Sequence, residues 1–319
     1  MGGRPRLWSA RQWIGLHRTR VGVVCWARLA GWQTISRKVG RFEILDELGR
    51  GPMTVDYRAN DPATGRTVVL TIPSEDSPDS PILLARFYRE ARAAGALQHP
   101  NIIAIYDLGV DRGSPFITSE LLEGSTLEQI MEREKSEGTQ STKSAATFLD
   151  YILQVSRGLA FAHQKGILHR DVRPGTIFVT KTGTAKLTNF AFARLPQATS
   201  RPYGNLVGTI DYLAPEIMCG DHVDGKADIW ALGCTMYEVL TYTRPFHGEK
   251  MTEWMFSIMS QEPKPLRELR PDLHLEIDEI VRRALKKDRH ERYKNAERLI
   301  ADLEPVVLRM QSAASAAAE

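Results

Sequence analysis

The sequence predicts an α+β fold with two lobes, in which a small β-rich lobe precedes a larger and mainly helical one. Short strand-like runs separated by turn residues fill the part of the chain that follows Gly40. Beyond Gly124 the apolar residues recur at helical spacing over longer segments. The 319 residues, 42% of them apolar and 25% charged, are enough for two such lobes and are typical of a globular protein.

The first lobe is expected over residues 39–123, as a three-strand meander followed by one helix and two further strands. A turn signal, Asp61-Pro-Ala-Thr-Gly65, separates the second strand from the third. Residues 82–97 carry apolar side chains at spacings of three and four, which predicts the helix. The expected strands cover 42–48, 54–59, 67–72, 102–108 and 116–121.

The second lobe is expected over residues 124–304 and is built mainly from helices. Residues 135–146 are polar and rich in serine and threonine, which predicts a surface loop. Residues 305–319 are expected to form a tail after the last helix. The expected helices cover 127–134, 147–164, 227–241, 252–260, 277–286 and 295–303.

Residues 1–38 differ from the rest of the chain, because they contain eight Arg or Lys residues, four of the six tryptophans and no acidic residue. Basic residues interleaved with aromatic ones can lie on an anionic membrane surface or stack on nucleic-acid bases. A disordered leader, or a start of translation assigned too far upstream, explains the same composition. The rest of the chain carries 34 basic and 39 acidic side chains, which argues against nucleic-acid binding by the body of the protein.

The composition also disfavours membrane receptors and zinc proteins. No run of the sequence approaches the roughly 18–20 consecutive apolar residues of a transmembrane helix, so no transmembrane segment is expected. The three cysteines, Cys25, Cys219 and Cys234, have neither disulfide nor metal-site spacing. This cysteine usage is typical of a reducing compartment and predicts a cytoplasmic protein.

Several short motifs occur in a fixed order along the body of the chain. Leu48-Gly49-Arg50-Gly51 lies between two predicted strands, where bare backbone can approach a phosphate. The later motifs are His169-Arg170-Asp171, Lys186-Leu187-Thr188-Asn189-Phe190-Ala191, Gly208-Thr209, Ala214-Pro215-Glu216, Asp228-Ile229-Trp230-Ala231-Leu232-Gly233 and Arg292. Together, over about residues 40–304, they resemble the eukaryotic-like Ser/Thr protein kinases found in bacteria.

The resemblance implies a two-lobed kinase fold that binds ATP in the cleft and acts on a protein substrate. It implies that Asp171 is the catalytic base, that Asp228 holds the backbone of the catalytic loop, and that Glu216 and Arg292 form a buried ion pair. The nucleotide-binding positions that it implies are Leu48, Gly49, Gly51, Thr71, Glu90, Glu120, Leu122 and Phe178, with Ser119 as gatekeeper. The regulatory positions that it implies are Arg170, Thr199, Ser200 and Thr209.

Positions that carry the chemistry depart from the family pattern. In the V-A-I-K strand this chain ends on Thr71, so a neutral hydroxyl replaces the ammonium that would hold the phosphates. Asn189 replaces the metal-binding aspartate of the D-F-G motif, Thr176 the asparagine of the second metal, and Arg173 a phosphate-contacting lysine. No lysine occurs between residues 39 and 134, so only an arginine such as Arg50 or Arg58 could replace the missing charge.

The glycine-rich loop departs from the pattern as well. In the ungapped register Thr54 takes the position of the third glycine, and Asp56 that of the valine that covers the adenine. An anion there would oppose a polyphosphate. A shifted alignment would instead make Asp56 an insertion and place a bulge in the strand.

These departures predict a pseudokinase, that is, a kinase-like signalling protein that has lost efficient phosphotransfer and acts by binding a protein partner. ATP binding is expected to be weak, and Mg²⁺ binding weak or absent, because Asn189 and Thr176 occupy the metal positions. Asp171 is retained, although an aspartate at this bend can also serve the backbone alone. The alternative is an active Ser/Thr protein kinase that transfers the ATP γ-phosphate to protein Ser/Thr with atypical cleft residues.

Overall fold

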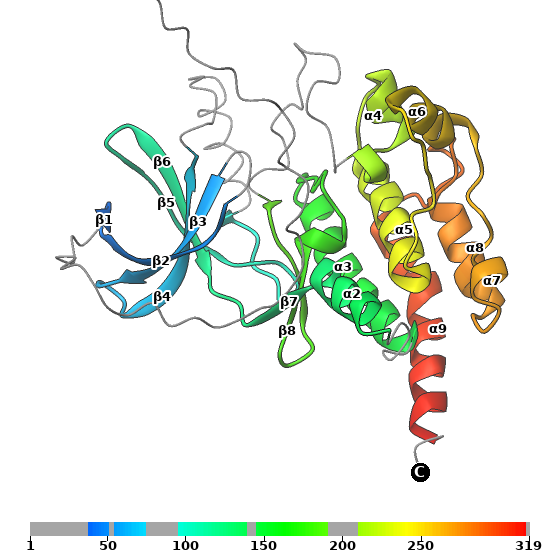
Figure 1. Cartoon of the computed structure of the whole chain (residues 1–319), viewed down its shortest axis with the longest axis horizontal. Helices are drawn as coiled ribbons and strands as arrows, with labels where there is room; N and C mark the ends of the chain where they lie inside the picture. Colours follow the sequence, from blue (N-terminus) through cyan, green and yellow to red (C-terminus); the bar gives the residue numbers. More distant parts are fainter. Residues whose placement is uncertain (1–37, 51–53, 75–94, 139–144, 191–209, 317–319) are drawn as a thin grey trace, which may run out of the picture. The chain divides into compact units, whose positions relative to one another are not determined.

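The computed structural model describes residues 38–50, 54–74, 95–138, 145–190 and 210–316. These residues belong to one compact unit, Arg37–Glu319. The predicted α+β fold is confirmed, because antiparallel strands form the first lobe and helices form most of the second (Figure 1). The predictions that lie outside the described residues concern the leader at 1–37, most of the helix at 82–97, Gly51, Glu90, Thr199, Ser200 and Thr209.

A six-stranded antiparallel sheet with the order β1-β2-β3-β4-β6-β5 forms the first lobe. Its strands are β1 (Lys38–Val39), β2 (Phe42–Arg50), β3 (Thr54–Asp61), β4 (Arg66–Pro73), β5 (Ile105–Asp111) and β6 (Ser114–Glu120). The sequence predicts five of these strands. It misses β1, because two residues are too few for an alternating pattern.

Alternate side chains of β3 and β4 build the core of this lobe. The side chains that point into the core are Val55, Tyr57, Ala59, Val68 and Leu70, all of them buried. Because successive side chains of a strand point to opposite faces, Asp56 and Thr71 lie on the other face of the sheet.

The pairing of β3 with β4 decides between the two registers of the glycine-rich hairpin. This ladder runs without interruption over eight residue pairs and places Asp56 opposite Thr71. The pairing of β2 with β3 is the irregular one, because Leu45 and Leu48 are each skipped in its register. Asp56 is therefore a regular residue of β3, and the bulge that the shifted alignment predicts does not occur in this ladder.

Helices form most of the second lobe, together with a three-stranded sheet of β7 (Gly124–Thr126), β8 (Ile177–Thr180) and β9 (Ala185–Leu187). The helices are α2 (Leu127–Ser136), α3 (Ala145–Gln164), α4 (Pro215–Cys219), α5 (Gly225–Thr241), α6 (Met251–Ser260), α7 (Leu266–Leu269), α8 (Leu275–Ala284) and α9 (Ala296–Ala316). Most of α5 and more than half of α3 are buried, so these two helices supply much of the core of the lobe. Within the described ranges, no helix combines the length and hydropathy that a membrane span requires.

The last helix is longer than the sequence predicts. The predicted helix ends at residue 303 and a tail follows, but α9 continues through Pro305 to Ala316. A proline inside a helix costs about 3 kcal/mol, which is why Pro305 indicates a helix end. Here the next two residues, Val306 and Val307, are buried in the core of the lobe, and their burial offsets the cost of the proline.

Truncation of the chain after Glu304 should lower the free energy of unfolding by about 2–3 kcal/mol, because Val306 and Val307 leave the core. Truncation after Met310 should lower the free energy of unfolding much less, because the described residues beyond Met310 are mostly exposed. Urea denaturation of both truncated chains and of the full chain measures the difference. Equal losses for the two truncations would contradict a structural role for residues 305–310.

Candidate functional site

The segment from His169 to Thr176 is held in place by Asp228 of α5. This buried carboxylate accepts hydrogen bonds from the backbone N–H groups of His169, at 2.8 Å, and Arg170, at 2.6 Å. The ring of His163 on α3 contacts the same carboxylate at 2.7 Å. Burial alone would raise the pKa of Asp228, but the His163 contact and the backbone donor outweigh burial and lower it. The role that the resemblance implies for Asp228 is therefore confirmed.

Arg170 adopts a backbone conformation that needs this support. Its φ of +64° lies in the left-handed region, which residues other than glycine rarely occupy. The bond from its N–H to Asp228 stabilises the turn. Arg170 is predicted to accept the charge of a phosphorylated residue, and this role stays a prediction because Thr199, Ser200 and Thr209 lie outside the described residues.

Asp171, the predicted catalytic base, forms an ion pair within its own loop. Its Oδ1 atom lies 3.2 Å from Nε of Arg173, and both side chains are 26% exposed. Burial raises the pKa of Asp171, and the positive charge of Arg173 opposes that shift. The guanidinium at the position of the phosphate-contacting lysine is thus engaged by the carboxylate of the predicted base.

Thr176 uses its hydroxyl group to brace the same loop. The side chain is completely buried, and its Oγ1 donates toward the carbonyl oxygens of Asp171, at 2.6 Å, and Arg173, at 3.1 Å. The same oxygen accepts a hydrogen bond from the N–H of Arg173 at 3.2 Å. Because these backbone groups surround the only side-chain oxygen, Thr176 does not fit the role of a metal ligand.

Asn189 has a left-handed backbone conformation, and its side chain changes the chemistry of the motif. Its φ is +65°, a left-handed conformation that asparagine tolerates better than most residues. The next side chain, Phe190, is buried and packs edge-on against His169, with ring centroids 4.5 Å apart. A neutral amide oxygen is a weaker ligand for Mg²⁺ than a carboxylate. Among the residues that the structure describes, no group of three His, Cys, Asp or Glu side chains is placed to hold a metal ion.

On the sheet, Thr71 of β4 is hydrogen-bonded to Asp56 of β3. The Thr71 hydroxyl donates to Oδ1 of Asp56 at 2.6 Å. Burial raises the pKa of Asp56, and the Thr71 bond opposes that shift. The position of the phosphate-binding lysine is therefore taken by a hydroxyl group whose proton is already shared with an acid.

The two arginines that could replace the missing lysine are each paired with another acid. Arg50 contacts Glu47 with two nitrogens, at 3.2 and 3.1 Å, and Arg58 contacts Asp46 in the same way, at 2.6 and 2.9 Å. Both pairs are exposed. In the described part of the chain, neither guanidinium therefore neutralises Asp56.

Glu120, a predicted nucleotide-binding position, is tied to the second lobe by an ion pair that the sequence does not predict. The Glu120 carboxylate of β6 accepts hydrogen bonds from Nζ of Lys186, at 2.7 Å, and from the N–H of Ala104, at 2.8 Å. Lys186 lies on β9, opposite Phe178 of β8. A single lysine in a short strand gives no periodic signal, and only the tertiary structure brings it to Glu120. The charge of this predicted cleft residue is thus cancelled by Lys186.

The remaining predicted nucleotide-binding residues range from exposed to buried. Leu48 is exposed, and a Cβ at Gly49 would meet no atom within 4 Å. Leu122 and Phe178 are half-buried. Ser119 is buried and pairs with Val69 in the ladder between β4 and β6. Small and apolar side chains therefore accompany the Glu120 and Lys186 pair.

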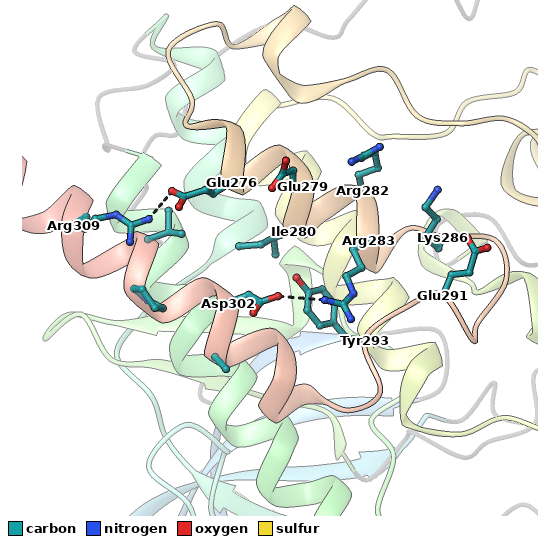
Figure 2. A pocket seen from close by; sticks show the side chains of 13 residues that line it. Glu276, Glu279, Ile280, Arg282, Arg283, Lys286, Glu291, Tyr293, Asp302 and Arg309 are labelled. Carbon is teal, nitrogen blue, oxygen red and sulfur yellow. Dashed lines mark hydrogen bonds and ion pairs between the residues drawn. The ribbon is translucent and has the colours of Figure 1, made fainter.

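A separate cavity of about 680 Å³ is lined by residues of α8 and α9 and the segment that joins them (Figure 2). Its charged side chains pair with one another, as Arg309 does with Glu276 at 2.5 Å and Arg283 with Asp302 at 3.5 Å. The Arg283 guanidinium also lies over the ring of Tyr293. None of the predicted site residues lines this cavity, so it is distinct from the predicted cleft.

The sequence is similar to known protein kinases over most of its length. Residues 42–302 match the family model of the protein kinase domain. A "Probable serine/threonine-protein kinase" of Streptomyces coelicolor is 34% identical over 272 residues, which are 83% of this chain and 40% of that protein. The serine/threonine-protein kinase PknB of Mycobacterium leprae is 34% identical over 269 residues, 82% of this chain and 42% of that protein. The chain spans about two fifths of the length of these relatives.

The structure is similar to solved kinase domains. A crystal structure of a mutant PknI kinase domain of Mycobacterium tuberculosis superposes with a TM-score of 0.68 at 25% sequence identity. The superposition covers 85% of this chain and 97% of the other. The two-lobed architecture is therefore shared along nearly the whole of that domain.

Proposed function

This chain belongs to the protein kinase domain family, and within that family we propose that it is a pseudokinase that acts in signalling by binding a protein partner. Members of the family use ATP and Mg²⁺ and act on protein substrates. The proposal concerns what the altered cleft of this chain retains of that activity. The boundary between the lobes at residue 123 and the cytoplasmic location stay predictions.

The observation that carries the proposal is the hydrogen bond between Thr71 and Asp56. Phosphoryl transfer depends on positive charge placed around the phosphates, and a lysine at position 71 would supply part of that charge. Here a hydroxyl group donates to a carboxylate at 2.6 Å, so this part of the site carries negative charge when Asp56 is ionised. The described arginines near it are paired with Glu47 and Asp46.

The metal positions support the same conclusion. The Thr176 oxygen is surrounded by backbone groups of its own loop, and Asn189 offers only a neutral amide. Bound Mg²⁺ would normally bridge the phosphate oxygens and neutralise developing charge. The residues at these positions do not fit that ion.

The scaffold around the altered positions is intact, which favours a binding role over a decayed sequence. Asp228 holds the loop, Phe190 packs on His169, and Glu216 pairs with Arg292. A partner protein can therefore recognise a stable kinase-like surface even where phosphotransfer is slow.

The size of the expected loss in catalytic rate distinguishes a slow enzyme from an inert one. Loss of one preorganised charge-stabilising group costs about 10²–10³ in rate. Three such losses from a kinase that turns over at about 1–100 s⁻¹ leave at most about 10⁻³ s⁻¹, even when the losses are far from additive. An active kinase with atypical cleft residues remains the second candidate, and retained Asp171 is the observation that favours it.

Phosphate transfer from radiolabelled ATP tests the proposal directly. The full chain is incubated with a generic basic protein and Mg²⁺ or Mn²⁺, beside Asp171→Ala as the matched control. We expect incorporation by the wild type to equal that of the control. Incorporation well above the control would establish the second candidate.

Any binding of ATP should also be nearly independent of Mg²⁺. Neither Thr176 nor Asn189 supplies the carboxylate that the ion prefers, so the metal should add little to the affinity. Thermal melting of the full chain at millimolar ATP, with and without Mg²⁺, measures the effect. A stabilisation by ATP that requires Mg²⁺ and amounts to several kcal/mol would contradict this prediction.

A further inference from the structure

We infer that the cleft selects a ligand without phosphate groups, a nucleoside such as adenosine, and that Asp56 is the residue that discriminates against the phosphates. The inference rests on the proposed function, since it names the ligand class that the altered cleft retains. It goes beyond weak ATP binding, because it predicts that removal of the phosphates improves the affinity.

The position of Asp56 is fixed by the sheet. Eight uninterrupted residue pairs join β3 to β4 and place Asp56 opposite Thr71. The neighbours of Asp56 in β3, Val55 and Tyr57, are buried in the core, so its side chain points to the opposite face. The carboxylate is half-buried there, at the position of the residue that covers the adenine in the family pattern.

The charge of this carboxylate is not compensated in the described part of the chain. The described side chain that contacts it is the hydroxyl of Thr71, which is neutral. Burial raises the pKa of Asp56, and no cation among the described residues opposes that shift. Arg58, the next residue but one, points its guanidinium at Asp46.

A carboxylate at this place acts differently on the two parts of a nucleotide. The phosphates of ATP carry several negative charges, and each is repelled by a nearby carboxylate, more strongly in a partly buried site than in water. The base and ribose are uncharged, so they escape this repulsion. In a kinase, a lysine and bound metal ions would compensate for this repulsion. Thr71 and Thr176 supply neither, because their hydroxyl groups donate to oxygens of the protein.

The predicted nucleotide position at Glu120 is electrically balanced. The Glu120 carboxylate is paired with Lys186 at 2.7 Å, and Ser119 beside it is small and neutral. Phe178 offers a half-buried aromatic surface. An uncharged heterocycle is therefore not repelled, even beside Asp56, whereas a phosphate tail is repelled by a carboxylate that no cation among the described residues compensates.

Isothermal titration of the full chain with adenosine, AMP, ADP and ATP, without metal and with Mg²⁺, tests the inference. We expect adenosine to bind at least about tenfold more tightly than ATP, with AMP and ADP between them. Asp56→Asn keeps a side-chain oxygen for the Thr71 hydroxyl and removes the charge. The affinities for adenosine and ATP should therefore differ by no more than about threefold in this variant. Asp56→Val is the second variant, should Asp56→Asn fail to fold.

Asp111→Asn is the matched control, because it makes the same change on β5, at the edge of the same sheet. It should leave the ratio of adenosine to ATP affinity unchanged. The inference is overturned if ATP binds as tightly as adenosine to the wild type, if neither ligand binds at millimolar concentration, or if the Asp56 variants leave the ratio unaltered. Failure of the proposed function would be seen separately, as phosphate transfer by the wild type that Asp171→Ala abolishes.

Discussion

A variant that combines Asp56→Val with Thr71→Lys, Thr176→Asn and Asn189→Asp should transfer phosphate to a generic basic protein at least about 100-fold faster than the wild type. Three of the substitutions restore a charge or ligand that the kinase pattern places around the phosphates, and Asp56→Val removes a negative charge from beside residue 71. The groups act as one electrostatic unit, so single substitutions should have little effect. The scaffold that carries them, with Asp228 holding the loop, is already in place.

Asp56→Val is the decisive member of this set. In the wild type the Asp56 carboxylate lies 2.6 Å from the Thr71 hydroxyl, so an ammonium introduced by Thr71→Lys alone would pair with it. The triple variant that retains Asp56 should therefore recover much less activity than the quadruple variant. Thr176→Asn must in addition preserve the contacts of Thr176 with Asp171 and Arg173, and a normal melting curve for that single variant would show that it does.

The measurement is incorporated radiolabelled phosphate per mole of substrate protein for the wild type and for each single, triple and quadruple variant. Asp171→Ala in the quadruple background is the control for transfer by this site. A wild-type rate equal to that of the quadruple variant, and abolished by Asp171→Ala, would show that this chain is an active kinase with an unusual cleft.

The scaffold could be predicted from the sequence because its residues lie in motifs with a fixed order. Asp228 and the pair of Glu216 with Arg292 have the contacts that the resemblance implies. Strand and helix positions followed from apolar periodicity, which reflects which face is buried. The exceptions include β1, the sheet of β7, β8 and β9, and the last part of α9, where Pro305 indicates a helix end and only the packing of Val306 and Val307 shows that the helix continues.

The contacts of the cleft could not be read in the same way. The sequence shows that Thr71 and Asp56 are each atypical, but their hydrogen bond depends on strand register, for which two alignments were open. The pair of Glu120 with Lys186 joins residues 66 positions apart and follows no local pattern. Two side chains that meet only in the folded protein appear in the sequence as separate residues without a shared pattern. Their contact can be identified only once the fold brings them together.

The second large effect is expected at the buried ion pair of the helical lobe. Arg292 donates two hydrogen bonds to Glu216, at 2.7 and 2.8 Å, and the two side chains are 0% and 5% exposed. The same guanidinium also donates to the carbonyl oxygens of Lys286, Lys226 and Lys287. Removal of either partner leaves a buried charge without compensation, which costs about 3–5 kcal/mol.

Arg292→Met should therefore lower the free energy of unfolding by about 3–5 kcal/mol, and Glu216→Gln by a comparable amount, in urea denaturation of the full chain. Arg157→Met is the matched control, because Arg157 lies 2.6 Å from Glu304 in a pair whose side chains are 44% and 42% exposed. That substitution should cost less than about 1 kcal/mol. The double variant of Glu216→Gln with Arg292→Met should lose less than the sum of the two single losses, because it leaves neither charge unpaired. Equal losses at the buried and the exposed pair would show that burial does not decide the strength of these interactions in this protein.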